Sequence, residues 1–317
     1  MRFFPIAATL LLVSAGFHHS PLRADSPWII DTHTHFKGTE QVLAEHAARS
    51  FDPRNTLGQV FVPNDYAPIA ERLGIRATVV VEAVDQDLLR FNDWVIDQAD
   101  SDLICGYVAH GDLTADDFAS HHQRYMESGH LKGYRIRMGE LASCLESEQG
   151  RKHLAMLEQQ GLVADLLIDA KQIDDVITLS NDFPKLSVVI NHGFRARMVD
   201  GKPTEQWLAA VRRAGTLPNV HCKFSSLIDF SGVKPFSGEA PSDLKAYLPV
   251  FQPLMESFGE DRLIFGTNWG VCTHYGSVDA VVSLALDYLN QHGKAAVQKV
   301  MRDNAVRVYH LSAADVE

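Results

Sequence analysis

The stretch WIIDTHTHF, residues 28–36, decides the fold because it joins a strand-like apolar run to two histidines two positions apart. Its opening residues are apolar and β-branched, which is typical of a strand buried on both faces. Side chains alternate across a strand, so His33 and His35 share one face near the carboxyl end of this strand. Two neutral imidazoles held in this way can bind one divalent metal ion. The alternative is a structural pair of surface histidines.

Seven further apolar runs follow, and segments with the apolar spacing of amphipathic helices separate them. The runs are residues 77–83, 103–110, 131–137, 162–168, 186–192, 220–225 and 262–269. The helical segments are residues 65–73, 87–99, 115–128, 148–160, 171–183, 204–214, 242–258 and 278–291. Strands alternating with helices predict βα units around a parallel sheet, and eight units predict a closed (β/α)8 TIM-like barrel.

The runner-up is an open doubly wound sheet, but no glycine-rich phosphate loop follows the first strand. We expect one domain over residues 25–317, with long connections at residues 37–62 and 229–242. Connections of this length often carry function.

Composition excludes several classes of protein. The 317 residues are 46% hydrophobic and 22% charged, which excludes a disordered, collagen-like or coiled-coil chain. The formal net charge of −11 leaves no global basic surface, so we expect no nucleic-acid partner.

Residues 1–24 have the pattern of a signal peptide. Arg2 precedes an apolar run from Phe3 to Phe17, and Ala24 is a candidate last residue before cleavage. The run is shorter than the roughly 20 residues of a membrane span. We therefore expect an exported protein, periplasmic or secreted, that does not associate with the membrane after cleavage. The alternative is an uncleaved interfacial anchor.

Four cysteines, Cys105, Cys144, Cys222 and Cys272, show no CxxC spacing. Cys105 and Cys222 lie in strand-like runs, which favours buried free thiols. Export leaves room for one disulfide.

A third histidine, His192, closes the sixth strand-like run. The carboxyl ends of barrel strands meet at one mouth, so we expect His192 to lie near His33 and His35 as a third metal ligand. A lone histidine there would more often be a hydrogen-bonded structural group.

At this point the sequence resembles the amidohydrolase-related family, over about residues 28–311. The motifs that carry the resemblance are IIDTHTHF (29–36), LKGYRIR (131–137), NHG (191–193), NVHCKFS (219–225), DRLIFGTNWGVCT (261–273) and DNAVRVYHL (303–311). Within the family the chain looks most like the sugar-lactonase and dicarboxylate-lactonase branch. The resemblance implies a distorted barrel, a metal at its mouth in many members, and a hydrolytic or sometimes decarboxylating reaction. It also places the family's metal-ligand positions at His33, His35 and His192.

One position departs from the family pattern. The family usually has Asp where this chain has Asn268, and that Asp commonly serves as metal ligand and general base. The amide oxygen of Asn268 can contact metal or water, but it cannot take up a proton near neutral pH. Three alternatives follow. The protein is an inactive binder, or another residue serves as the base, or the reaction needs little help from a base because a metal ion lowers the pKa of its bound water.

Four side chains are candidate replacement bases at the barrel mouth. Glu82, at the end of the second run, is the first choice, and His274, six residues beyond Asn268, is the second. His110 and Asp169 follow the third and fifth runs. Each of the four is also compatible with a polar residue that only binds substrate or a loop.

Arginines indicate the charge of the substrate. Arg135 and Arg137 share a face of the fourth run, and Arg195 and Arg197 follow His192. Guanidinium groups grip carboxylates bidentately, so an acidic substrate or an anionic transition state fits this mouth. The alternative is that some of them pair with Glu140, Asp169 or Asp200.

Lysines indicate how many metal ions the mouth would hold. The fourth run has no lysine at the position where a carboxylated lysine would bridge two metal ions, because Lys132 lies at its start, on the opposite face from Arg135. This favours a single-metal site. Lys223, in the seventh run, is a candidate for an ion pair inside the barrel.

The leading hypothesis is an exported hydrolase that uses one divalent ion, zinc or manganese, to open a lactone or related cyclic ester. Its substrate would be a small acidic or sugar-derived molecule. The alternatives are a catalytically inactive ligand-binding barrel and a metal-dependent decarboxylase. The oligomeric state stays open.

Overall fold

The computed structural model describes residues 28–83, 88–98 and 101–312. The predicted signal peptide lies outside these residues and stays a prediction. All eight predicted strands are present, and they form one parallel sheet in chain order. The strands are β1 Ile29–Thr34, β2 Ile75–Val81, β3 Ile104–His110, β4 Leu131–Arg137, β5 Val163–Leu167, β6 Ser187–Ile190, β7 Val220–Phe224 and β8 Leu263–Phe265.

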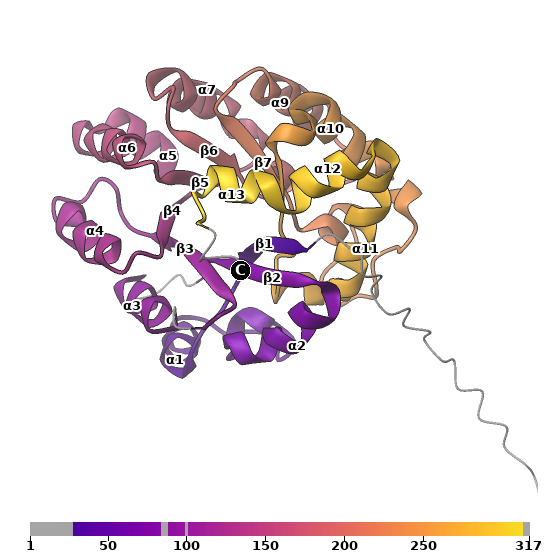
Figure 1. Cartoon of the computed structure of the whole chain (residues 1–317), viewed down its shortest axis with the longest axis horizontal. Coiled ribbons are helices and arrows are strands. Elements are labelled where there is room, and N and C mark those ends of the chain that lie inside the picture. Colours follow the sequence, from indigo (N-terminus) through magenta and orange to yellow (C-terminus); the bar gives the residue numbers. More distant parts are fainter. Residues whose placement is uncertain (1–27, 84–87, 99–100, 313–317) are drawn as a thin grey trace, which may run out of the picture.

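The sheet closes between β1 and the segment that follows β8. The backbone N–H of His35 donates to Trp269 O at 2.7 Å, and Thr32 Oγ1 donates to Phe265 O at 2.7 Å. Helices surround the ring of strands (Figure 1). The predicted single-domain (β/α)8 barrel is therefore confirmed.

Each predicted amphipathic segment contains a helix. The helices are α1 Thr39–Ala48, α2 Pro63–Leu73, α3 Leu88–Gln98, α4 Phe118–Glu127, α5 Glu140–Glu146, α6 Glu148–Gln160, α7 Ile173–Asp182, α8 His192–Arg195, α9 Glu205–Gly215, α10 Leu248–Arg262, α11 Val278–Leu289, α12 Lys294–Gln298 and α13 Asn304–Val308. Local signals set their ends. At α6, for example, the Ser147 side chain accepts a hydrogen bond from the Gly150 N–H, and Gly161 ends the helix with φ of 69°.

Helix α1 lies within residues 37–62, which the sequence presented as a plain connection. Its two bulky aliphatic residues are adjacent, and Val42 is buried whereas Leu43 is 63% exposed. Such a helix has no apolar stripe, so periodicity does not reveal it.

The barrel interior is filled from both the strands and the C-terminal segment. Ile30, Val79, Val108, Val189 and Ile264 pack there with residues of α13 and with Tyr309 and Leu311, which follow it. The side-chain amide of Asn304 donates to two backbone oxygens. One belongs to Glu260, which precedes β8, and the other to Leu263, the first residue of β8. Helix α13 therefore closes the amino end of the barrel, and the carboxyl end is left for a site.

A buried ion pair lies inside the barrel, as the sequence suggested for Lys223. Lys223 Nζ is 2.7 Å from Asp165 Oδ2, and the Tyr309 hydroxyl donates to the same oxygen at 3.0 Å. All four cysteines are buried free thiols. Among the helices of the described residues, none has the length and apolar character needed to cross a bilayer.

Candidate active site

Three imidazoles from two distant parts of the chain meet at the carboxyl end of the barrel. His33 lies on β1, His35 follows that strand, and His192 follows β6. The ring centroid of His33 is 4.9 Å from that of His35 and 4.4 Å from that of His192. All three side chains are buried. The structure thus brings together the three residues named as candidate metal ligands.

The side chain of Asp31 connects β1, close to His33, with the segment that follows β8. Its carboxylate accepts hydrogen bonds from the Thr267 N–H at 2.8 Å, the Thr267 hydroxyl at 2.5 Å and the Tyr66 hydroxyl at 2.7 Å. The same carboxylate accepts the His33 N–H at 3.0 Å. These bonds fix the backbone on which His33 and Asn268 are held.

The hydrogen-bond partners of the three rings show which nitrogen of each ring carries the proton and which carries the lone pair. His35 Nδ1 donates to the carbonyl oxygen of Val81 at 2.9 Å, so the neutral ring carries its lone pair on Nε2. That atom lies 3.2 Å from Asn268 Oδ1, another acceptor. His192 Nδ1 is 2.9 Å from Ser225 Oγ. A hydrogen bond at Nδ1 fixes the ring and leaves Nε2 for another partner, as is usual for a histidine that binds a metal ion.

His33 has a different partner. Lys223 Nζ donates to His33 Nδ1 at 3.2 Å, and His33 Nε2 is buried with no hydrogen-bond partner among the described residues. A neutral ring that accepts at Nδ1 carries its proton on Nε2. A metal ion at Nε2 would therefore need the other neutral tautomer, with the ring proton on Nδ1 and with Lys223 turned away or uncharged.

Burial keeps all three imidazoles neutral. Burial lowers the pKa of His33 and that of His192 well below the usual value, and the charges of Lys223 and Arg135 add to the effect. Burial, and next the Arg135 charge, lowers the pKa of His35 to about 3. Neutral imidazoles and an amide oxygen are the donor types that a divalent cation binds, but among the described residues the three rings, as placed, do not form a set of three ligands around one point.

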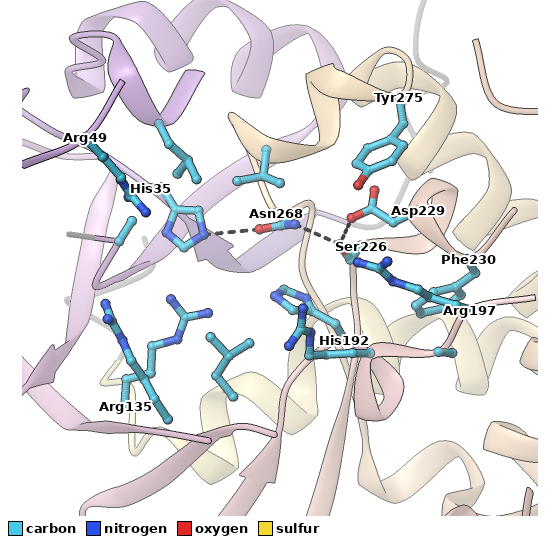
Figure 2. Close-up of a pocket in the computed structure, with 17 residues that line it drawn as sticks. His35, Arg49, Arg135, His192, Arg197, Ser226, Asp229, Phe230, Asn268 and Tyr275 are labelled. Atoms are coloured by element: carbon cyan, nitrogen blue, oxygen red, sulfur yellow. Dashed lines mark hydrogen bonds between the residues drawn. The ribbon is translucent and has the colours of Figure 1, made fainter. Parts of the chain in front are cut away.

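A cavity of about 370 Å³ opens above the imidazoles (Figure 2). Its size suits a small molecule. Of the three histidines, His35 and His192 line it. The other lining residues are Arg49, Leu57, Ala83, Arg135, Arg137, Leu167, Arg195, Ala196, Arg197, Ser226, Asp229, Phe230, Asn268, Val271 and Tyr275.

Within the part of the chain that the structure describes, five arginines line this cavity against one carboxylate, that of Asp229. Arg137 pairs with Glu82 at 2.5 Å, and Arg49 pairs with Glu45 at 2.5 Å. Arg195 and Arg197 have no ion-pair partner among the described residues. The surplus of guanidinium groups makes the cavity complementary to an anion.

Backbone strain is concentrated at the same site. The four residues of α8 all have positive φ, between 51° and 58°, so His192–Arg195 form a left-handed turn. Ser226 and Asn268 are also left-handed, with φ of 57° and 61°. Such conformations cost about 1–3 kcal/mol each and persist where the surroundings impose them. The buried Phe194 and the Trp207 Nε1 bond to Gly193 O at 2.7 Å hold the turn.

The two favoured replacement bases are not among the residues that line the cavity. Glu82 is buried, and its Oε1 accepts a bond from Arg137 at 2.5 Å. His274 Nε2 faces Thr56, 3.1 Å from its N–H and 2.7 Å from its hydroxyl.

The other two candidates are also engaged elsewhere. His110 Nε2 lies 3.0 Å from Glu140 Oε1, beside a separate hollow between the ends of β3 and β4. The Asp169 carboxylate accepts the Lys171 N–H and begins the turn after β5. The sequence expectation thus overlooked the carboxylate that does face the cavity, Asp229. Asp229 opens the long connection 229–242, and that length was the only sequence signal for it.

Comparison with known proteins agrees with this geometry. The family model described as amidohydrolase matches residues 30–311. An L-fucono-1,5-lactonase of Burkholderia ambifaria is 25% identical over 294 residues, covering 89% of this chain and 95% of that protein.

Solved structures show the same fold. An amidohydrolase of Burkholderia multivorans with bound zinc is 23% identical with a TM-score of 0.77, covering 90% of this chain and 100% of that one. A Pseudomonas putida structure named as a 2-pyrone-4,6-dicarboxylic acid hydrolase is 19% identical with a TM-score of 0.68, covering 90% and 98%. The resemblance stated from the motifs is confirmed: the chain belongs to the amidohydrolase family and is a hydrolase.

Proposed function

We propose that this protein is an exported lactonase that opens a small cyclic ester carrying a carboxylate. One observation carries the proposal: the buried imidazoles of His33, His35 and His192 meet beneath a cavity that arginines line. The similarity to the Burkholderia lactonase supports the ester-opening reaction. The family alone supports hydrolysis but does not name a substrate, because this barrel hosts many chemistries.

One divalent ion, zinc or manganese, is part of the proposal. His33, His35 and His192 would hold it, and Asn268 Oδ1 faces the same position through its contact with His35. The zinc bound to the Burkholderia multivorans amidohydrolase supports this choice. Such an ion supplies a polarised carbonyl and a bound water of lowered pKa.

The chain's own residues orient the substrate. Arg195 and Arg197 enter the cavity from the turn that carries His192, so a substrate carboxylate held there would keep its ester close to the imidazoles. Arg135 is fixed by bonds from its guanidinium to Glu82 O at 2.5 Å and to Asn191 Oδ1 at 3.4 Å. Fixed guanidinium groups stabilise negative charge as it develops on the ester oxygen without having to reorganise.

The test is a screen of matched lactones with a pH indicator, because opening the ring releases a proton. We expect measurable hydrolysis, and we expect carboxylated lactones to give higher kcat/KM than neutral sugar lactones of the same ring size. Release of carbon dioxide from an enol or aromatic acid, without lactone opening, would favour the decarboxylase alternative. Ligand binding without any turnover would favour the inactive barrel.

Export is the part of the proposal that rests on sequence alone. We expect the mature protein to begin at Asp25 and to be found outside the cytoplasm. Intact mass of the purified protein, together with cell fractionation, tests this. A cytoplasmic protein that retains residues 1–24 would contradict it.

A further inference from the structure

Three polar side chains form a directed chain along one wall of the cavity (Figure 2). The amide of Asn268 donates to Ser226 Oγ at 2.8 Å. The Ser226 hydroxyl in turn donates to Asp229 Oδ2. A serine has one hydroxyl proton, so a hydroxyl that accepts from Asn268 can give its own proton to Asp229. The hydrogen bonds are therefore donated in one direction, from Asn268 through Ser226 to the Asp229 carboxylate.

The second oxygen of Asp229 is unused. Asp229 Oδ1 is buried, and no hydrogen-bond partner reaches it among the described residues. The residue lines the cavity, and the Tyr275 hydroxyl points toward its carboxylate (Figure 2). A buried carboxylate oxygen without a partner is costly, so its retention beside a cavity calls for an explanation.

The protonation behaviour of this group suits proton transfer. Burial raises the pKa of Asp229 to about 7, although the Ser226 hydrogen bond and the Arg197 charge act to lower it. A general base works best when its pKa lies near the working pH. A carboxyl group with a pKa of about 7 is half ionised at neutral pH, and its ionised form can accept a proton at that pH.

The side chain at residue 268 sets the direction of the hydrogen bonds that join it to Ser226 and Asp229. An amide at this position donates to Ser226 and leaves the Ser226 proton for Asp229. A carboxylate at 268 would compete for that same proton, and two carboxylates sharing one hydroxyl raise each other's pKa. The protein thus has an amide at residue 268, where the family resemblance places a carboxylate, and it has a carboxylate at residue 229.

We propose that Asp229 is the catalytic general base of this hydrolase, and that Ser226 and Asn268 are positioning residues that orient its carboxylate. This rests on the proposed lactonase function. A water molecule gives a proton to Asp229 as its oxygen bonds to the ester carbonyl carbon. The bond from that carbon to the ring oxygen then breaks, and Asp229 returns the proton to the departing oxygen. Lactone and water become a hydroxy acid, which ionises.

The first test is the pH dependence of kcat and KM for Asp229→Asn and Ser226→Ala. Asp229→Asn should lower kcat by roughly 100-fold to 10,000-fold, with KM changed by less than about threefold. Ser226→Ala keeps the carboxylate but removes a bond that lowers its pKa, so the activity midpoint should move to higher pH. Asp287→Asn, on the exposed face of α11, is the matched control and should change neither. Retention of wild-type kcat and pH profile by Asp229→Asn overturns the proposal.

The second test needs no substrate, which separates failure of this inference from failure of the lactonase proposal. Infrared or carbon-13 titration of the full-length protein should show a carboxyl group with a midpoint near pH 7. That signal should vanish in Asp229→Asn and move upward in Ser226→Ala. A spectrum in which every carboxyl group is ionised by pH 5 overturns the assignment even if the wild-type protein hydrolyses lactones.

Discussion

His35 Nε2 lies 3.2 Å from Asn268 Oδ1, and both atoms present a lone pair. Two acceptors at this distance repel each other unless a cation lies between them or the amide turns its Nδ2 toward the ring. Ligand bonds of about 2.0–2.1 Å around a tetrahedral ion place neighbouring ligand atoms about 3.3 Å apart. The pair is therefore spaced like two ligands of one ion, although Asn268 brings no charge.

Asn268→Asp should raise the affinity for zinc by roughly tenfold or more, because it adds a full negative charge next to the ion. Titration with zinc, followed by calorimetry, measures the change. The same variant also tests the inactive-barrel alternative. A wild-type protein without turnover that gains hydrolysis on Asn268→Asp would support that alternative against the lactonase account.

Arg197→Ala should raise KM for a carboxylated lactone by about tenfold to 100-fold, because a hydrogen bond to a charged group contributes about 1.5–3 kcal/mol. The KM for a neutral lactone of the same ring size should change little. Arg213→Ala is the matched control, since Arg213 pairs with Asp174 between α9 and α7. Equal loss for both lactones would show that Arg197 does not read the substrate carboxylate.

The buried pair of Lys223 and Asp165 gives a stability prediction. Lys223→Met leaves Asp165 buried without its partner charge, which should cost about 3–5 kcal/mol in the free energy of unfolding. Replacing both residues, as Lys223→Met with Asp165→Leu, should recover most of that loss. Urea unfolding of the single and double variants measures it. A single variant as stable as the wild type would contradict a charged pair at this position.

The depressed histidine pKa values make the metal-free protein sensitive to acid. An unfolded histidine takes up a proton below about pH 6.5, whereas His35 stays neutral in the folded state down to a pKa of about 3. Its stabilising contribution is present above pH 6.5 and is lost as the pH falls toward 3, at up to about 1.4 kcal/mol per pH unit. His35→Gln should flatten the acid limb of the stability curve, measured in a chelating buffer. An unchanged slope would place His35 in a solvated, chargeable setting.

The sequence predicted the barrel because its signals are periodic. Short β-branched runs identified all eight strands, and the rule that barrel strands end at one mouth placed His192 beside His33 and His35. Arg135 and Arg137 were likewise assigned to the mouth from alternation along one strand.

The remainder of the site could not be read in this way because it depends on loops and on register. Asp229 and Ser226 follow β7 in a segment without periodicity, and the positive φ of Ser226 has no sequence signature. Glu82 is the natural first choice as a base, because a carboxylate at a strand end near the metal position is the closest substitute for an Asp at residue 268, but its partner Arg137 lies two strands away in the sheet. Only the three-dimensional pairing shows that this carboxylate is already engaged.

The most direct test is metal content measured alongside lactone hydrolysis in the wild type and in His33→Ala, with His121→Ala on α4 as the matched control. We expect about one zinc or manganese ion per wild-type chain, and hydrolysis that disappears together with the ion in His33→Ala but not in the control. Full lactone hydrolysis by a folded His33→Ala protein would contradict the claim that these three imidazoles are the centre of the active site.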